Sequence, residues 1–245
     1  MSSLALAEPS QAASVSSLVE RLGLEPEFAE SEVLELALRH RSWCGEQGGV
    51  ASNERLEFLG DAVLQMMVTD RLYRIEPDSA EGALAQRRAS LVSTRALAGA
   101  ARRIDLGSCV RLGRGEQATG GADKDSILAD CAEALFGAYY LYAGIESATA
   151  LIGRFLDEEF EQIRLGNWVG DPKSRLQEVA VQVLELVPQY EIEEVGPDHA
   201  KEFTAEVHLG DNPHGRGIGR TKKEAEQAAA QAALERLANE GKLEQ

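Results

Sequence analysis

Two stretches of the chain, residues 53–64 and 126–140, carry apolar residues at the three- and four-residue spacing of an α-helix. In the first stretch these residues are Leu56, Leu59, Val63 and Leu64, and in the second they are Ile127, Leu128, Ala134, Leu135 and Tyr139. Each stretch therefore predicts a helix that turns one broad apolar face towards the core.

Helical spacing dominates the rest of the first two thirds of the chain. Helices are predicted over residues 15–22 and 31–39, with Ser31 as the N-cap of the second. The helix from residue 53 continues until Pro77 ends it, and the next one opens at Glu81. A last amphipathic helix is predicted over 145–164, and the glycine-rich segments 44–52 and 106–125 are predicted loops. The first domain is therefore expected to be all-α, over residues 16–164.

The pattern changes after residue 164. A short linker, 165–170, precedes Asp171 and Pro172, which suit the N-cap and the first position of a helix. Apolar and polar residues then alternate over 190–195 and 203–209, and a short third strand is predicted over 215–220. Thr221-Lys-Lys-Glu224 has the form of a capping box that opens a last helix. These elements predict a small α+β domain of order α-β-β-β-α over 171–239, with a disordered N-terminus at 1–15 and a tail at 240–245.

Composition adds few constraints. Cys44, Cys109 and Cys131 are scattered, so they indicate neither a disulfide framework nor a metal knuckle, and a reducing cytoplasm is expected. Residues 1–17 lack the basic start and apolar run of a signal peptide, and no stretch has the length of a membrane span. Contact with a membrane is therefore not expected. The glycine-rich segments lack a Gly-Lys-Ser/Thr pairing, so a nucleotide cofactor is not expected either.

Acidic residues interrupt both predicted helices. Glu57 and Asp61 are four residues apart and Asp130 and Glu133 are three apart, so each pair lies on one helical face. Like charges at this spacing destabilise an isolated helix, whereas a divalent cation would remove the repulsion. Two such pairs suit a Mg²⁺ site if the helices cross at them. The alternative is that each pair is simply a solvated helix face.

Both stretches resemble the signature of the ribonuclease III family of double-stranded-RNA endonucleases. The matching residues are Asn53-Glu-Arg-Leu-Glu-Phe-Leu-Gly-Asp-Ala-Val-Leu64 and Ser126-Ile-Leu-Ala-Asp-Cys-Ala-Glu-Ala-Leu135. The resemblance implies that the metal ligands are Glu57, Asp61, Asp130 and Glu133, with Asp61 and Glu133 as the catalytic acids. It implies Mg²⁺ as the cofactor, which Mn²⁺ can replace, and places Glu54 and Glu81 as further acids along the cleavage valley. It also implies a homodimer through the signature helix with Phe58 at the interface, although Phe58 as an ordinary core residue is the alternative.

The C-terminal domain resembles a double-stranded-RNA-binding domain. The matching residues are Asp171-Pro172-Lys173, Phe203-Thr-Ala-Glu-Val207 and Gly219-Arg-Thr-Lys-Lys-Glu-Ala-Glu-Gln-Ala-Ala229. Such domains recognise the A-form shape of RNA through 2′-hydroxyl and phosphate contacts. The resemblance implies that the RNA-contacting residues of this domain are Gln177, Glu178, Pro197, Asp198, His199, Lys222 and Lys223.

A basic stripe in the first domain offers further RNA contacts. Arg88, Arg95 and Arg102 recur every seven residues, with Arg87 and Arg103 beside them. The stripe is either a solvated surface or a ridge that contacts phosphates, since arginine binds phosphate bidentately. The family places RNA-facing basic residues here, which favours the second interpretation, most strongly for Arg88 and Arg95.

The net charge of −16 opposes this view, because nucleic-acid-binding proteins are usually basic. Phosphate contacts, however, depend on local patches, and bound cations reverse the local sign. Glu191, Glu193 and Glu194 are expected on a strand face that is turned away from RNA.

The predicted function is Mg²⁺-dependent hydrolysis of phosphodiester bonds in double-stranded RNA, leaving 5′-phosphate and 3′-hydroxyl ends. Ribosomal RNA precursors and some messenger and transfer RNA precursors are the substrates that the resemblance implies. The main rival hypothesis is a regulator that binds double-stranded RNA without cleaving it. Two further hypotheses are an enzyme that acts on small phosphate compounds and a nuclease directed at DNA.

Overall fold

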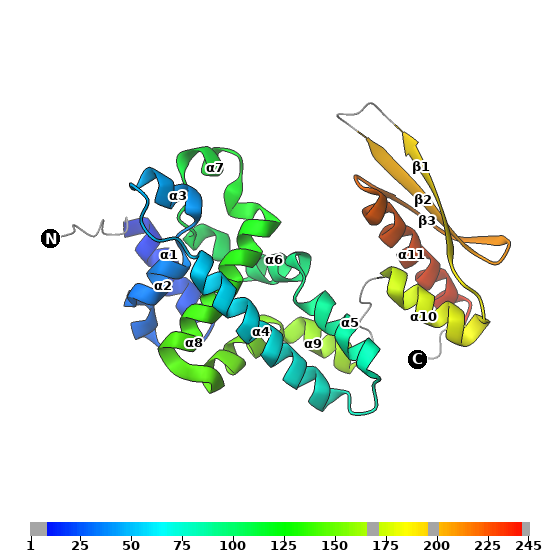
Figure 1. The fold of residues 1–245 in the computed structure, drawn as a ribbon, viewed down its shortest axis with the longest axis horizontal. Helices are drawn as coiled ribbons and strands as arrows, with labels where there is room; N and C mark the ends of the chain where they lie inside the picture. Colours follow the sequence, from blue (N-terminus) through cyan, green and yellow to red (C-terminus); the bar gives the residue numbers. More distant parts are fainter. Residues whose placement is uncertain (1–8, 166–171, 196–200, 242–245) are drawn as a thin grey trace. The chain divides into compact units, whose positions relative to one another are not determined.

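The computed structural model describes residues 9–165, 172–195 and 201–241 of the chain, which divides into two compact units, 1–161 and 162–245 (Figure 1). The first unit is built of helices, and the second combines two helices with a three-stranded sheet. The fold class expected from the sequence, an all-α domain followed by an α-β-β-β-α domain, is confirmed. None of the helices that these residues form has both the length and the apolar character needed to cross a membrane.

Helices α4 and α8 form the centre of the first unit. The helices of the described chain up to residue 165 are α1 (Pro9–Arg21), α2 (Glu32–Ala37), α3 (Arg41–Glu46), α4 (Glu54–Ile75), α5 (Glu81–Leu91), α6 (Thr94–Arg103), α7 (Arg114–Ala118), α8 (Asp125–Phe155) and α9 (Asp157–Arg164), with 3-10 turns at Pro26–Glu30, Leu106–Cys109 and Gly121–Asp123. Leu64, Val68 and Leu72 of α4 are fully or almost fully buried, as are Leu135 and Phe136 of α8. All the apolar residues of the two stretches that were predicted to face the core are buried except Leu59, which is partly buried.

Helix α8 changes direction at Gly144. This residue has φ +83° and a non-helical ψ, a conformation that glycine adopts without steric cost. Before the break, α8 lies against the N-terminal half of α4, where Gly137 faces Gly60. After it, α8 follows the second half of α4, where the Arg71 side chain donates a hydrogen bond to the Gly153 carbonyl (3.3 Å).

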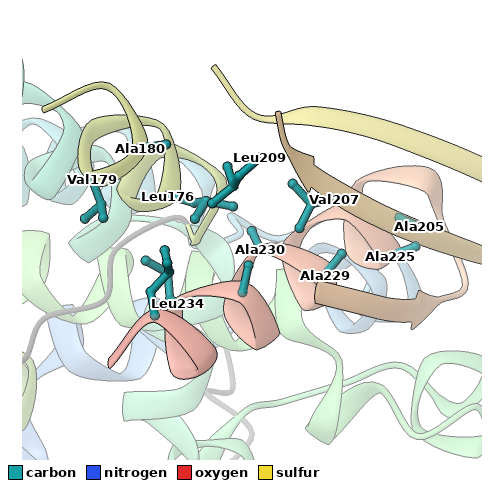
Figure 2. Close-up of a cluster of buried hydrophobic side chains, with 12 residues drawn as sticks. Leu176, Val179, Ala180, Ala205, Val207, Leu209, Ala225, Ala229, Ala230 and Leu234 are labelled. Atoms are coloured by element: carbon teal, nitrogen blue, oxygen red, sulfur yellow. The ribbon is translucent and has the colours of Figure 1, made fainter. Parts of the chain in front are cut away.

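The second unit packs α10 (Pro172–Leu184) and α11 (Lys222–Asn239) on one face of an antiparallel sheet. The strands are β1 (Gln189–Val195), β2 (Glu202–Leu209) and β3 (Asn212–Gly219), in the order β1-β2-β3. Figure 2 shows the core between them: Leu176 and Val179 of α10, Val207 and Leu209 of β2, and Ala229, Ala230 and Leu234 of α11. A Cβ on Gly217 would lie only 2.5 Å from the Ala225 carbonyl oxygen, so β3 needs glycine to approach α11.

Several predicted boundaries were wrong. The first helix begins at Pro9, so residues 9–15 are helical rather than disordered. Residues 106–125 contain α7 and two 3-10 turns rather than a plain loop. The helix predicted over 145–164 is interrupted at Leu156, between α8 and α9. Short helical turns with glycine-rich flanks give no clear periodic signal, which explains why they were missed.

Local capping chemistry accounts for other boundaries. Ser31 caps α2 as predicted, because its side chain accepts a hydrogen bond from the Leu34 N–H (3.3 Å). Cys44, predicted to begin a loop, lies in α3, and the loop begins after this helix. The N-cap of α3 is His40, whose ring accepts a hydrogen bond from the Ser42 N–H (3.3 Å). Strand β3 begins at Asn212 and includes Pro213, which an edge strand tolerates.

Candidate functional site

The site is built where two glycines let α4 and α8 come into backbone contact. Gly60 and Gly137 are both buried. A Cβ on Gly137 would lie 3.0 Å from the Gly60 nitrogen, and one on Gly60 would overlap the Glu133 carbonyl and lie 2.9 Å from the Gly137 nitrogen. No residue larger than glycine fits at this crossing. The crossing brings the Glu57–Asp61 pair of α4 within electrostatic reach of the Asp130–Glu133 pair of α8.

The four carboxylates influence one another electrostatically. Burial, together with the charges of Asp61, Glu57 and Asp130, raises the pKa of Glu133 to about 7. Burial also raises the pKa of Glu57, with Asp130, Glu54 and Asp61 adding to the effect. The pKa of Asp130 is raised by burial, while His40 and Arg41 act in the opposite direction. All four predicted ligands are thus brought into one partly buried acidic region.

The donor chemistry suits a hard divalent cation, because carboxylate oxygens are the ligands that Mg²⁺ prefers. The carboxylates are not, however, arranged as a ready coordination sphere. Within residues 9–165, 172–195 and 201–241, no group of three or more His, Cys, Asp or Glu side chains is positioned to hold a metal ion. Asp61 instead accepts a hydrogen bond from the Gln65 amide (3.3 Å). Rotation of the side chains would be needed for them to share a cation.

The two other predicted acids lie in different places. Glu54 is exposed at the first turn of α4, accepts a hydrogen bond from the Ser52 hydroxyl (2.6 Å), and acts electrostatically on Glu57. Glu81 begins α5, beyond the opposite end of the 22-residue α4, whose length is about 33 Å. Glu81 is therefore not brought to the four carboxylates of its own chain, and its role stays a prediction.

Sequence reasoning missed the residues that hold the site together. Asn53 is buried although polar (3% exposed), and its amide donates to the Ala37 carbonyl (3.2 Å), while its backbone N–H donates to the Arg39 carbonyl (2.9 Å). Gly60 and Gly137 were also missed. A glycine inside an apolar helical pattern is a signal of close backbone approach and could have revealed this crossing.

The basic stripe is not one helical ridge. A break at Val92 and Ser93 separates α5 from α6, and Ser93 caps α6 by accepting from the Ala96 N–H (3.3 Å). Three of its arginines form ion pairs: Arg87 with Glu76 (2.6 Å), Arg102 with Asp123 (2.6 Å) and Asp125 (2.7 Å), and Arg103 with Glu159 (2.8 Å). The arginines at seven-residue spacing are therefore divided between two helices.

The two arginines that were favoured as RNA contacts have different surroundings. Arg95 is exposed on α6. Arg88 donates to the Thr69 hydroxyl (3.2 Å) and lines an open cavity of about 530 Å³ with Met66 and Tyr73 of α4. The RNA contacts of both residues stay predictions.

Phe58 is not a core residue. It is 82% exposed, and Met66 (52%) and Tyr73 (72%) follow it at helical spacing along the same side of α4. These three residues form an exposed apolar stripe on a helix whose other side is buried. Such a stripe is typical of a protein–protein contact.

In the second unit, Lys222 and Lys223 lie exposed at the N-terminus of α11. The capping box forms with a one-residue shift: Thr221 accepts from the Glu224 N–H (3.1 Å), and the Glu224 carboxylate accepts from the Arg220 N–H (2.8 Å). Gln177 is exposed on α10. Glu178 belongs to α10, but its side chain lies outside the described part, as do Pro197, Asp198 and His199 entirely.

The acids of β1 divide between the two faces of the sheet. Glu191 pairs in register with Glu206, and Glu193 with Thr204, whereas Ile192 pairs with the buried Ala205. Residues that pair directly share a face, so Glu191 and Glu193 lie on the face away from the helices. Glu194 lies on the other face and forms an ion pair with Lys201 (2.6 Å), so the expectation that it shares a face with the other two acids was wrong.

Comparison with known proteins matches this architecture. The family model described as Ribonuclease-III-like matches residues 30–159, more than half of the chain, and the double-stranded RNA binding motif matches residues 172–237. The chain belongs to the ribonuclease III family. It is an endoribonuclease that carries a double-stranded-RNA-binding domain.

Individual members of the family support the same assignment. The chain is 50% identical to Ribonuclease 3 of Streptomyces coelicolor over 91% of its own length and 80% of that protein. It is 52% identical to Ribonuclease 3 of Thermobifida fusca over 82% of its own length and 84% of that protein. A solved structure of the ribonuclease III nuclease domain from Campylobacter jejuni aligns with a TM-score of 0.56 at 37% identity. It covers 60% of this chain and 99% of that one, and it is described as flexible in a region involved in dimer formation.

Proposed function

We propose that this endoribonuclease hydrolyses phosphodiester bonds of double-stranded RNA with the help of Mg²⁺ held by Glu57, Asp61, Asp130 and Glu133. The observation that carries the proposal is the convergence of these carboxylates at the Gly60–Gly137 crossing. Their burial and mutual repulsion favour the binding of a cation. When bound, Mg²⁺ would offset charge on the phosphate oxygens and lower the pKa of a water molecule.

The protein's own groups divide the remaining work. Glu133, with a pKa of about 7, can accept and release a proton at neutral pH, which suits a group that takes a proton from the attacking water. Asp61 is held by Gln65 beside it. Asn53 holds the start of α4 through its bonds to Ala37 and Arg39, which keeps Glu57 in position. The products would carry 5′-phosphate and 3′-hydroxyl ends.

The second unit would bring the duplex to this site. Lys222 and Lys223 extend from the N-terminus of α11, where the helix dipole also attracts phosphate. Gln177 on α10, together with Glu178, Pro197, Asp198 and His199, would contact the minor grooves. The acids Glu191 and Glu193 lie on the sheet face opposite to the helices, so they do not oppose this contact directly.

Two chains would form a homodimer through the apolar stripe of Phe58, Met66 and Tyr73. A two-fold contact uses the same surface on both chains. An antiparallel pairing of the two α4 helices would bring the partner's Glu81 towards the carboxylates at the other end of α4. This arrangement would explain how Glu81 can serve a site from which it is distant in its own chain. Two related sites could then cut one strand each.

The cellular role follows from the family resemblance. We expect processing of ribosomal RNA precursors, and of some messenger and transfer RNA precursors, in the cytoplasm. Mn²⁺ is expected to replace Mg²⁺, since carboxylate ligands bind both.

The test is cleavage of a long RNA duplex by the full chain. Three reactions are compared: the unmodified protein with Mg²⁺, the same protein with EDTA, and Glu133→Gln with Mg²⁺. Cleavage in the first reaction alone, with short 3′ overhangs and 5′-phosphate ends, would support the proposal. Binding without cleavage in all three would overturn it and leave an RNA-binding regulator, and cleavage of a DNA duplex at equal salt would point to a DNA-directed nuclease.

A further inference from the structure

The carbonyl oxygen of Ala37 joins three elements beside the acidic site. It accepts a hydrogen bond from the Asn53 amide at the start of α4 (3.2 Å) and a weaker one from the Cys131 thiol of α8 (3.6 Å). Cys131 directly follows Asp130 in sequence. Since the Arg39 carbonyl also accepts from the Asn53 N–H (2.9 Å), the backbone of residues 37–39 is tied to the acidic segments of both helices.

Two residues further along, this segment presents Arg41. Arg41 is the first residue of α3, which His40 caps, and its side chain is exposed. The backbone ties therefore hold Arg41 at the edge of the acidic region. In agreement with this placement, Arg41 is a source of positive potential at both Glu57 and Asp130.

Arg41 differs from the arginines around it. Arg39 and Arg111 both bind the Glu35 carboxylate (2.8 and 3.1 Å) and both lie over the Trp43 ring (5.9 and 5.2 Å), so they are part of the packed structure. Within the described ranges 9–165, 172–195 and 201–241, Arg41 has no side-chain hydrogen bond and no ion pair within 4.0 Å. In the described part of the chain its guanidinium is therefore unpaired, and it acts electrostatically on Glu57, Asp130 and Glu116.

We propose that Arg41 binds a phosphate of the RNA strand next to the scissile bond and so fixes that strand over the carboxylates. This inference rests on the proposed function. An RNA strand that approaches several carboxylates is repelled by them, and a cation at their rim would oppose the repulsion where the strand passes. A guanidinium can bind two phosphate oxygens at once and keeps its charge at every relevant pH, so it can also set the register of the strand.

The contact would form in the ground state and persist through the reaction. Loss of Arg41 should therefore raise KM more than it lowers kcat. The expected change in KM is roughly tenfold, typical of one charge-assisted hydrogen bond at an exposed position. Arg41→Lys should keep part of the effect, because it keeps the charge but loses the bidentate geometry.

The test uses the full chain and a short RNA duplex with one mapped cleavage site. KM and kcat are measured for the unmodified protein, Arg41→Ala, Arg41→Lys and the control Arg21→Ala. Arg21 is a suitable control because it is exposed on α1 and, among the residues that the structure describes, bonds only to Ser17 of the same helix. Thermal melting of each variant shows whether any loss arises from unfolding.

A second measurement identifies the phosphate. RNA binding is measured in the Glu133→Gln background, with single methylphosphonate substitutions that remove the charge of one phosphate at a time. At the position that Arg41 contacts, the substitution should weaken binding by the unmodified Arg41 protein and leave binding by Arg41→Ala unchanged. At every other position, the losses of binding free energy caused by the methylphosphonate and by Arg41→Ala should add.

The inference is overturned if the effects of the methylphosphonate and of Arg41→Ala on binding free energy add at every phosphate. It is also overturned if Arg41→Ala lowers the melting temperature and Arg41→Lys restores the melting temperature without restoring KM. These outcomes are separate from a failure of the proposed function. If no variant cleaves the duplex, the proposed function fails, while the binding measurement still decides whether Arg41 contacts a phosphate near the carboxylates.

Discussion

Gly60 of α4 and Gly137 of α8 are in backbone contact: a Cβ on Gly137 would lie 3.3 Å from the Gly60 Cα and 3.0 Å from its nitrogen. The acids of the site lie within about two helical turns of these glycines on each helix. The closeness of the helix crossing therefore sets the distance between the two acidic pairs.

Gly60→Ala tests this relationship. The added methyl group would overlap the Glu133 carbonyl, so the helices must separate. We expect a loss of about 3 kcal/mol in the free energy of unfolding and a large loss of cleavage. The matched control is Gly99→Ala in α6, where a Cβ meets nothing within 4 Å; it should stabilise the protein by about 0.5–1 kcal/mol. Urea unfolding measures the free energy of unfolding of both variants. Equal changes in Gly60→Ala and Gly99→Ala would contradict a close helix crossing at Gly60.

Glu133→Gln should make the folded chain more stable at alkaline pH in the absence of divalent cations. The pKa of Glu133 is raised from 4.5 to about 7, mainly by burial. Between pH 4.5 and about pH 7 this carboxyl group is therefore protonated in the folded state and ionised in the unfolded state. The free energy of unfolding therefore falls as pH rises from about 4.5 to about 7, and it stays at the lower value above that range. Glutamine carries no charge and should recover about 1–2 kcal/mol at pH 8, with no gain at pH 4.

Thermal melting across pH, with EDTA present, measures this difference. A gain that is the same at pH 4 and pH 8 would show that the effect is one of packing rather than of charge.

Glu57→Gln should weaken Mg²⁺ binding roughly tenfold or more, because it removes one of the carboxylates around the proposed cation. The control is Glu146→Gln, an exposed acid on the part of α8 beyond Gly144. Calorimetric titration of the RNA-free protein with Mg²⁺ measures both variants. Equal affinities for the two would argue against a cation at the helix crossing.

Phe58→Glu should convert the proposed homodimer into monomers. The side chain is 82% exposed in a single chain, so the substitution should leave the melting temperature of the monomer almost unchanged, whereas a charge within the apolar stripe should cost about 2 kcal/mol or more of association free energy. Ile218→Glu, at a 57% exposed position of β3, is the matched control. Sedimentation equilibrium distinguishes the two, and an unchanged dimer in Phe58→Glu would exclude the α4 stripe as the interface.

Lys222→Ala and Lys223→Ala should each weaken RNA binding and lower the slope of log affinity against log salt by about one. Arg236→Ala is the control, because Arg236 lies near the other end of α11 and pairs with Glu240 (2.9 Å). Binding to an RNA duplex is measured at several salt concentrations in EDTA. A slope that does not change would mean that these lysines do not contact phosphates.

The sequence determined the helices and strands whose periodic patterns are long, because burial of one face dictates the spacing of apolar residues. It predicted α4 and the first part of α8 with their acidic pairs, the α-β-β-β-α order of the second unit, and the cap at Ser31. It could not predict the breaks at Ser93 and Leu156, since apolar residues continue across both.

Only the tertiary structure decided which side chains meet. The seven-residue spacing of Arg88, Arg95 and Arg102 suggested one ridge, but the chain turns at Ser93, and Arg102 is held by Asp123 and Asp125 from a distant part of the sequence. The raised pKa of Glu133 likewise depends on burial and on charges from another helix. Sequence spacing fixes neighbours within one helix, whereas contacts between helices depend on packing, which here is set by two glycines and one buried asparagine.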